Sequence, residues 1–146
     1  MDDEAQQRAQ RASAAMASAD QASALLGVEV VEVTPGRATC RMQITGSMIN
    51  GHDIGHGGYV FMLADTAFAY ACNSHGPVTV AASAEITFVA PCRLDDVLVA
   101  EATERTRYGR SGVYDVTVRT SEGMVVAEFR GRSRTIGPAG DPEVAE

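Results

Sequence analysis

The stretch NGHDIGHGGYVFMLADTAFAYACNSHG, residues 50–76, decides the fold because its second half reads as a helix that is apolar almost all the way round. Apolar side chains recur at helical spacing and form a core stripe: Val60, Leu63, Ala64, Ala67, Phe68 and Ala71. The other positions are scarcely more polar, since only Asp65 and Thr66 interrupt them, and no Lys, Glu or Arg occurs between Tyr59 and Asn73. We therefore expect this helix to be covered by a sheet of its own chain and by a second copy of the protein.

The single carboxylate of this helix, Asp65, needs an explanation. An ionised carboxylate in apolar surroundings is unfavourable unless it is hydrogen-bonded or paired. One interpretation is that Asp65 binds a neighbouring backbone or side-chain group and only fixes the packing. The other is that it is a catalytic carboxylate, and the residues just before the helix favour this second interpretation.

The helix is preceded by His56-Gly57-Gly58. Free N–H groups at a helix N-terminus carry partial positive charge, and glycine lets a ligand approach the backbone, so this segment suits an oxyanion or a polarised carbonyl. The alternative is a tight turn that needs glycine only for its backbone angles. That alternative does not explain why Asp65 and Asn50, an amide able to hold a water molecule or a carboxylate, flank the segment.

The spacing between these candidates constrains how they can cooperate. Gly57 and Asp65 are about 12 Å apart if both lie on one helix, because the rise is about 1.5 Å per residue. A catalytic group and an oxyanion donor must each lie within about 3 Å of the reacting atoms. If both are catalytic, Gly57 of one subunit must approach Asp65 of another, which predicts a symmetric dimer with two sites.

The rest of the chain predicts a single α+β domain over residues 1–146. We expect an N-terminal helix over residues 3–26 that stops at Gly27, followed by a hairpin of strands 28–34 and 37–45 around Pro35-Gly36. Four long strands follow the apolar helix, at residues 78–89, 97–108, 113–120 and 124–136, and one antiparallel sheet built from all the strands would cover it. The tail, residues 137–146, contains two prolines and is expected to be disordered.

Composition restricts the classes of function. The chain has 146 residues and a formal net charge of −7, which argues against bulk affinity for nucleic acid or an anionic membrane but does not exclude an anionic small ligand. No apolar run approaches the roughly 18–20 residues that span a bilayer, and the polar N-terminus does not resemble a secretory signal. Three widely spaced cysteines without a C-x-x-C motif suit reduced thiols, so we expect a cytoplasmic protein.

The motif N-x5-H-G-G-x6-D, formed by Asn50, His56-Gly57-Gly58 and Asp65, and the run LADTAFAYACNS resemble the hotdog-fold acyl-CoA thioesterases, and in particular their phenylacetate-degradation branch. The resemblance extends over about residues 20–137. It implies a long central helix wrapped by an antiparallel sheet, assembled into homodimers and usually homotetramers. Asp53-Ile54-Gly55 departs from the polar and cysteine-containing residues common before the H-G-G of this family, at a position that touches no expected catalytic residue.

The resemblance also implies roles for the site residues. Asp65 would be the catalytic carboxylate, as nucleophile or as general base, Gly57 the oxyanion donor, and Asn50 the group that orients the water or the carboxylate. His56 would either donate to the thioester or cap the loop. The expected substrate is phenylacetyl-CoA or a ring-hydroxylated form of it, and no cofactor is expected, because coenzyme A is part of the substrate.

Further residues are candidates for binding the substrate. Gly58 belongs to the oxyanion turn, and Ser83 lies on the strand expected to line the pantetheine channel. Phe61 and Phe68 suit an aromatic acyl group, with a plain core role, the commoner fate of such residues, as the alternative. Arg107, Arg110 and Arg93 lie near turns and offer planar donors for the phosphates of coenzyme A, with solvated turn arginines as the alternative.

Three other interpretations have less support in the sequence. A metal site at His52 and His56 with Asp53 or His75 is disfavoured, because these residues lie in a glycine-rich loop without a Cys pair or an H-E-x-x-H motif. A hotdog hydratase would be expected to carry its own catalytic His and carboxylate motif, which is absent from the sequence. A non-catalytic acyl-CoA binder or sensor would not need the complete set of Asn50, Gly57 and Asp65.

Overall fold

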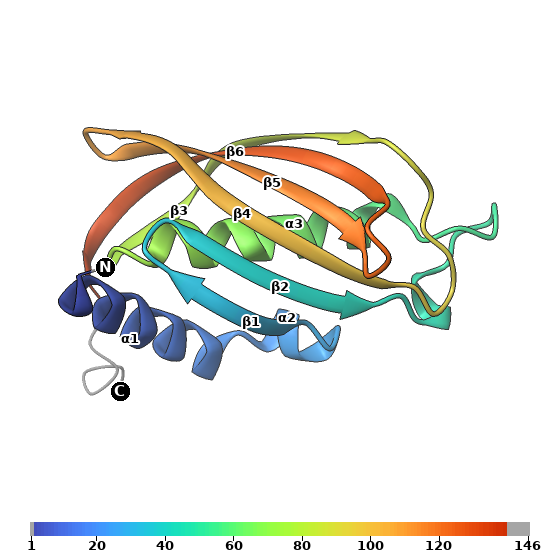
Figure 1. Ribbon diagram of the computed structural model, residues 1–146, viewed down its shortest axis with the longest axis horizontal. Coiled ribbons are helices and arrows are strands. Elements are labelled where there is room, and N and C mark those ends of the chain that lie inside the picture. Colours follow the sequence, from blue (N-terminus) through green and yellow to red (C-terminus); the bar gives the residue numbers. More distant parts are fainter. Residues whose placement is uncertain (1, 140–146) are drawn as a thin grey trace.

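The computed structural model of the protein describes residues 2–139 (Figure 1). In chain order these residues form α1 (Asp3–Ala19), α2 (Gln21–Leu25), β1 (Glu29–Thr34), β2 (Arg37–Gln43), the 3-10 helix η1 (Gly46–Met48), α3 (Gly57–Asn73), β3 (Pro77–Phe88), β4 (Val97–Tyr108), β5 (Ser111–Thr120) and β6 (Val125–Ala139). None of the helices within the described range is long and apolar enough to cross a lipid bilayer.

The strands of residues 2–139 form one antiparallel sheet in the order β1-β2-β4-β5-β6-β3. Figure 1 shows the sheet curving around α3, with α1 and α2 lying beside β1. The strands alternate as strands with one wet face do: β5 buries Tyr114, Val116 and Val118, and Asp115 and Thr117 between them are only partly buried. The predicted α+β hotdog architecture, with a central helix and an N-terminal helix, is confirmed.

Close packing of α3 against the sheet depends on a glycine in β6. A Cβ atom on Gly131 would lie 2.8 Å from ring atoms of Phe68, so the absence of a side chain there lets the helix seat its ring against the strand. Phe68 is 1% exposed and its ring also contacts Phe129 and Tyr114, with centroid distances of 5.9 and 5.5 Å. These contacts fix the position of α3, and with it the position of its first turn.

The N-terminal helix differs from the prediction of one helix over residues 3–26. It breaks at Asp20, whose side chain accepts a hydrogen bond from the Ser23 N–H at 3.1 Å and so caps α2 as a separate short helix. The hydroxyl of Tyr70 on α3 also donates to Asp20, at 3.3 Å, which ties the break to the central helix. Gly27, at φ +70°, ends α2 as predicted.

The C-terminal segment also differs from the prediction. Residues 137–139 continue β6, because Gly137 and Ala139 pair with Val78 and Pro77 of β3. The expected disorder therefore does not begin at residue 137. The rest of the predicted tail, residues 140–146, lies outside the described residues.

Two surfaces next to α3 are only partly covered within the described chain. Strand β3 is an edge of the sheet, and most of its residues are exposed. On α3 itself, Gly58, Phe61, Met62, Asp65 and Ala69 form a stripe that is not fully buried. We call these residues the open stripe of α3.

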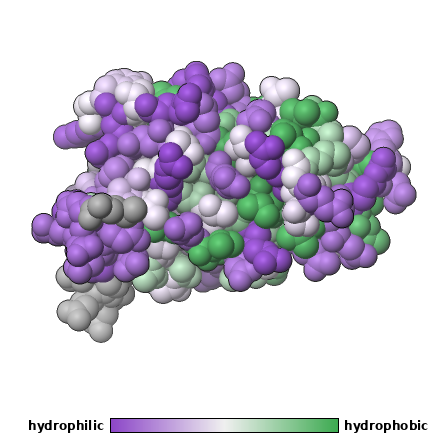
Figure 2. All heavy atoms as spheres, viewed as in Figure 1, coloured by the Kyte–Doolittle hydropathy of each residue, from purple (hydrophilic) through white to green (hydrophobic). Residues whose placement is uncertain are grey.

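Several exposed apolar side chains lie at one end of the molecule. Figure 2 shows hydrophobic residues toward the right of the view, where the β5–β6 turn and the loop after β3 lie, whereas the end that carries α1 is mostly hydrophilic. Exposed apolar residues of these segments include Phe88, Val89, Leu94 and Met124. The first turn of α3 opens toward Phe88 and Val89.

Candidate active site

The first turn of α3 is capped by His56. Its backbone is extended, with φ −64° and ψ 131°, and its Nδ1 accepts a hydrogen bond from the Gly58 N–H at 2.9 Å. Because Nδ1 is the acceptor, the proton of the neutral ring lies on Nε2. The structure therefore shows the capping role for His56, and the Nε2–H remains as a donor that the cap does not use.

Gly57, the first residue of α3, presents a backbone donor to a cavity. Within residues 2–139 no group accepts a hydrogen bond from the Gly57 N–H. Gly57 lines a cavity of about 460 Å³, which we call the Gly57 cavity, together with Asn50, Phe88, Val89, Pro91 and Cys92, among others. A Cβ atom on Gly57 would lie 2.8 Å from Phe88 Cζ, so the glycine lets the Phe88 ring lie against the helix start. A free N–H at a helix N-terminus beside an apolar ring is suited to stabilising an oxyanion.

Asn50 fixes the loop that forms one wall of the Gly57 cavity. Its Oδ1 accepts hydrogen bonds from the backbone N–H groups of His52, at 2.9 Å, and of Ile54, at 3.4 Å. The side-chain Nδ2 of Asn50 donates to no group of the described chain. The oxygen thus serves the loop, whereas the amide N–H groups remain for a ligand or a water molecule.

Asp65 lies on the open stripe of α3 and is half-buried. Within residues 2–139 its carboxylate makes no hydrogen bond and no ion pair, so the packing role considered from the sequence has no partner to support it. Burial raises the pKa of Asp65 above its ordinary value of 3.8. On the single helix α3 it remains about 12 Å from Gly57, so one chain alone does not bring the two together.

A second cavity lies on the other flank of the same helix start. It has a volume of about 480 Å³ and is lined by Gly58, Tyr59, Met62, His56, Met48, Ile49, Ser47 and Leu26. We call it the Tyr59 cavity. The rings of His56 and Tyr59 meet edge to face there, 6.1 Å apart. The two cavities thus flank the turn that carries the free Gly57 N–H, and Gly58 belongs to the second of them.

The two phenylalanines proposed for the acyl group lie elsewhere. Phe68 is a core residue, as described above, and lines neither cavity, so the structure favours the core alternative. Phe61 lies on the open stripe and packs edge to face on Phe129, with a centroid distance of 5.4 Å. Ser83 is exposed on the edge strand β3, opposite Arg132.

Arg107 and Arg110 are located at the far end of α3 from Gly57. They line a small cavity of about 50 Å³ together with Cys72, His75 and Tyr114, among others. Arg107 is paired with Glu104, 3.2 Å away, and Glu104 also accepts a hydrogen bond from Tyr114 and contacts His75, each at 2.8 Å. Burial alone would raise the pKa of Glu104, but these hydrogen bonds and charges hold it below its ordinary value. Within one subunit neither arginine reaches the Gly57 cavity.

Arg93, by contrast, directly follows a residue that lines the Gly57 cavity. It comes after Cys92, and its guanidinium approaches the backbone oxygen of Asp53 at 3.5 Å. Arg93 is exposed, so it remains available to a ligand.

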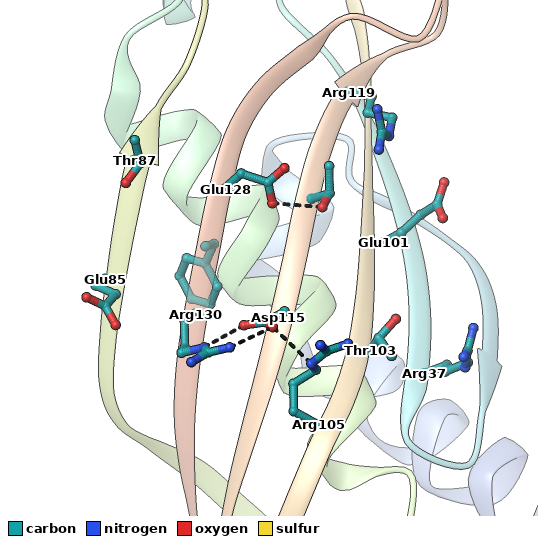
Figure 3. A pocket seen from close by; sticks show the side chains of 12 residues that line it. Arg37, Glu85, Thr87, Glu101, Thr103, Arg105, Asp115, Arg119, Glu128 and Arg130 are labelled. Carbon is teal, nitrogen blue, oxygen red and sulfur yellow. Dashed lines mark hydrogen bonds and ion pairs between the residues drawn. The ribbon is translucent and has the colours of Figure 1, made fainter.

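A hollow larger than either of these cavities lies on the outer face of the sheet, away from the start of α3. Figure 3 shows its lining of charged side chains from several strands. Its volume is about 750 Å³. Asp115 accepts two hydrogen bonds from Arg130, at 2.7 and 2.9 Å, and Arg105 lies 3.2 Å away. These charged side chains pair with one another on a solvent-exposed surface, so we assign this hollow to the solvated face of the sheet.

Comparisons with known proteins identify the family of this chain. Residues 52–127 match the family described as the thioesterase superfamily. The chain belongs to this superfamily. The acyl-coenzyme A thioesterase PaaI of Escherichia coli (strain K12) is 42% identical over 123 residues, which cover 84% of this chain and 88% of that protein.

Solved structures of superfamily members show the same fold. The E. coli PaaI protein from the phenylacetic acid degradation operon matches with a TM-score of 0.90 at 40% identity, covering 92% of this chain and 97% of that one. A single-residue mutant of the phenylacetic acid degradation protein PaaI from Thermus thermophilus matches with a TM-score of 0.75 at 32% identity, covering 78% of this chain and 97% of that one. The chain is thus an enzyme of the thioesterase class.

Sequence reasoning missed several residues around the site of this thioesterase. Phe88, Val89 and Cys92 line the Gly57 cavity, and Tyr59 and Met62 line the other one. The helical spacing contained a signal for Met62, because it lies on the same face as Asp65. No local pattern marks Phe88, which reaches Gly57 only because the sheet curves around the helix.

Proposed function

We propose that the chain hydrolyses acyl-CoA thioesters, with phenylacetyl-CoA or its ring-hydroxylated forms as substrates. The observation that carries the proposal is the pair of unused groups on α3: a free Gly57 N–H at the helix start and, two turns on, an unpaired Asp65 carboxylate on the open stripe. The similarity to PaaI proteins, one named an acyl-coenzyme A thioesterase and described with the phenylacetic acid degradation operon, supports the choice of substrate.

The site would be completed by a second subunit. Within the described chain the open stripe of α3 is only partly covered, and the edge strand β3 has no neighbour on its outer side. An unpaired edge is a surface that another strand can join. If Gly57 of one subunit meets Asp65 of its partner across a two-fold axis, that axis passes near residue 61, which lies midway between them. Phe61 would then pack near its own copy, which gives it an interface role. Further pairing of such dimers into a tetramer belongs to the same proposal.

In the proposed reaction the thioester carbonyl oxygen accepts a hydrogen bond from the Gly57 N–H. As a nucleophile attacks the carbonyl carbon, negative charge grows on this oxygen, and the fixed donor and the helix dipole stabilise it without rearranging. Collapse of the tetrahedral intermediate breaks the carbon–sulfur bond and releases coenzyme A as the thiolate, which then takes up a proton.

Asp65 of the partner subunit would supply the base or the nucleophile. As a base it takes a proton from an attacking water molecule, and as a nucleophile it forms a mixed anhydride that water then hydrolyses. The raised pKa of Asp65 supports both roles, because the carboxylate binds a proton more strongly. The amide N–H groups of Asn50 would orient the water or the carboxylate.

The three cysteines support the proposal of a reducing, cytoplasmic location. Cys40, Cys72 and Cys92 are all free and buried. Burial, together with smaller effects, raises the pKa of the first two to about 12, so neither is poised to act as a nucleophile.

The test is release of free thiol from a panel of acyl-CoA esters by the wild type and by Asp65→Asn. The amide has the same shape but neither attacks nor accepts a proton, so we expect a loss of at least about a hundredfold in kcat/KM. The variant should still elute at the same position as the wild-type oligomer in size-exclusion chromatography. Substantial activity in Asp65→Asn contradicts the catalytic role, and tight binding of coenzyme A without hydrolysis of any ester identifies a binder instead.

A further inference from the structure

The two cavities at the start of α3 divide the space around one backbone donor. Gly57 lines one cavity and Gly58 the other, and residues 49 and 50 are divided between them in the same way. Their volumes, about 460 and 480 Å³, both fall in the range of roughly 300–1,000 Å³ that is typical of small-molecule sites.

A thioester bound at this donor must extend in two directions. Its carbonyl carbon carries the acyl group on one side and the sulfur of the pantetheine arm on the other. With the carbonyl oxygen held by the Gly57 N–H, these two substituents lead away from the helix start on different sides. If an acyl-CoA thioester binds here, as the proposed function states, one substituent enters each cavity, and the features of the two cavities indicate which.

The Gly57 cavity has the features that the coenzyme arm requires. It opens at an exposed segment, since Phe88 and Val89 are each 55% exposed, and the large nucleotide of coenzyme A must reach solvent. Arg93, next to the lining residue Cys92, provides a guanidinium at this opening for a phosphate.

The Tyr59 cavity has the features that an aromatic acyl group requires. Neither cavity is lined by a Lys, Arg, Asp or Glu, but the Tyr59 cavity combines the Tyr59 ring with the thioethers of Met48 and Met62, which pack well against aromatic rings. Met62 and Gly58 belong to the open stripe, so a partner subunit on that stripe would close the cavity. A closed, uncharged cavity suits the blind end of the substrate.

We propose that the Tyr59 cavity binds the acyl group and sets acyl specificity, and that the Gly57 cavity binds the pantetheine arm. The residues that determine the choice of acyl group are then Tyr59, Met62, Met48 and Ser47, rather than the two phenylalanines of the helix. The hydroxyl of Tyr59 donates to no group within residues 2–139, so it is free to bind a hydroxyl on the ring of the acyl group.

The test introduces the same side chain, a phenylalanine, into each cavity in turn. Ser47 is an exposed residue of the Tyr59 cavity and Val89 an exposed residue of the Gly57 cavity, so Ser47→Phe and Val89→Phe each place a ring in one cavity at little risk to the fold. Each is combined with Asp65→Asn to keep the ester intact. Calorimetry then gives the affinities for phenylacetyl-CoA and for coenzyme A, and their ratio measures the contribution of the acyl group.

We expect Ser47→Phe to reduce this ratio by about tenfold or more, since it removes the space in which the ring is buried. Val89→Phe should weaken both ligands alike and leave the ratio unchanged. A third variant, Ser18→Phe on the exposed part of α1, controls for adding a ring outside both cavities and should change neither affinity. If Val89→Phe lowers this affinity ratio, or if Ser47→Phe leaves it at the wild-type value, the assignment of the two cavities is overturned.

The same data separate this inference from the proposed function. If the wild type hydrolyses no ester, the proposed hydrolysis fails, yet the affinity ratios still decide which cavity holds the acyl group. If the wild type hydrolyses phenylacetyl-CoA but the ratio responds only to Val89→Phe, hydrolysis is retained and the inference fails.

Discussion

Gly57 has two properties relevant to catalysis, its free N–H and its missing side chain, and a pair of substitutions separates them. Gly57→Ala and Gly57→Pro both add a Cβ atom that meets Phe88, at 2.8 Å before any adjustment, but only proline removes the N–H. Proline suits the first position of a helix, and the extended backbone of His56 is compatible with a following proline. We therefore expect both variants to fold.

The alanine variant should lose little kcat/KM, because the exposed Phe88 ring is free to move aside. The proline variant should fall a further roughly 100- to 1,000-fold, which is typical of removing an oxyanion donor. Steady-state thiol release measures both, and the melting temperature checks the fold. Equal activities for the two variants would rule out the N–H as the oxyanion donor.

We expect the ionised Asp65 carboxylate to lower the free energy of unfolding of the protein. Burial raises its pKa in the folded chain above the ordinary value of 3.8. At a pH below 3.8 the carboxyl group is protonated in both the folded and the unfolded chain. As the pH rises through the ordinary and then the raised pKa, the unfolded chain releases its proton first, so stability is lost.

Asp65→Asn cannot ionise, so at pH 7 it should have a larger free energy of unfolding than the wild type, and this gain should vanish below the ordinary pKa of 3.8. Urea unfolding at both pH values, at one protein concentration, measures it. Asp115→Asn is a control of opposite sign, because its hydrogen bonds from Arg130 hold the pKa of Asp115 below its ordinary value. A destabilised Asp65→Asn at pH 7 would show that the carboxylate has a structural partner after all.

Among single residues, the sequence marked Gly57 and Asp65 by their unusual places at the start and in the middle of an apolar helix, and Asn50 as a polar amide in the loop just before it. It did not mark Phe88, whose contact with Gly57 joins residues far apart in the chain. It also placed Phe68 with the substrate, although helical spacing alone does not tell a ring that faces a cavity from one that faces Gly131. Long-range contacts decide both cases.

The open stripe of α3 is the surface through which we expect two subunits to associate. If residue 61 lies at the two-fold axis, the two copies of Met62 are close together, so Met62→Arg would bring two guanidinium groups into contact in an apolar interface. We expect this variant to elute as a monomer and to lose activity while its helical circular dichroism is retained. Met62→Leu keeps the apolar contact, and Ala14→Arg on the exposed face of α1 controls for the added charge.

Both control variants should remain dimeric and active. An active, dimeric Met62→Arg would place the subunit contact elsewhere.

Most of the helices and strands followed from the sequence, because their apolar periodicity is strong. The break at Asp20 did not, since the helix-favouring Ala and Gln on both sides conceal a side chain that caps the next helix and binds Tyr70 on α3.

For the whole molecule, the decisive question is whether each site takes Gly57 from one subunit and Asp65 from the other. An Asp65→Asn subunit still has Gly57, and a Gly57→Pro subunit still has Asp65. In a heterodimer of the two, one site receives both intact groups and the other receives both lesions. Two inactive proteins should therefore restore activity when their subunits exchange.

Equal amounts of the two variants, unfolded together and refolded, should regain about one quarter of the wild-type kcat per subunit. Half of the randomly paired dimers are heterodimers, and one of the two sites in each is intact. Refolding each variant alone is the control and should regain none, and KM should match the wild type because the restored site is complete. If the mixture stays inactive although native mass spectrometry shows heterodimers, each site lies within one chain. Because Gly57 and Asp65 are about 12 Å apart along α3, one of the two would then have to be replaced in the site by another carboxylate or another oxyanion donor.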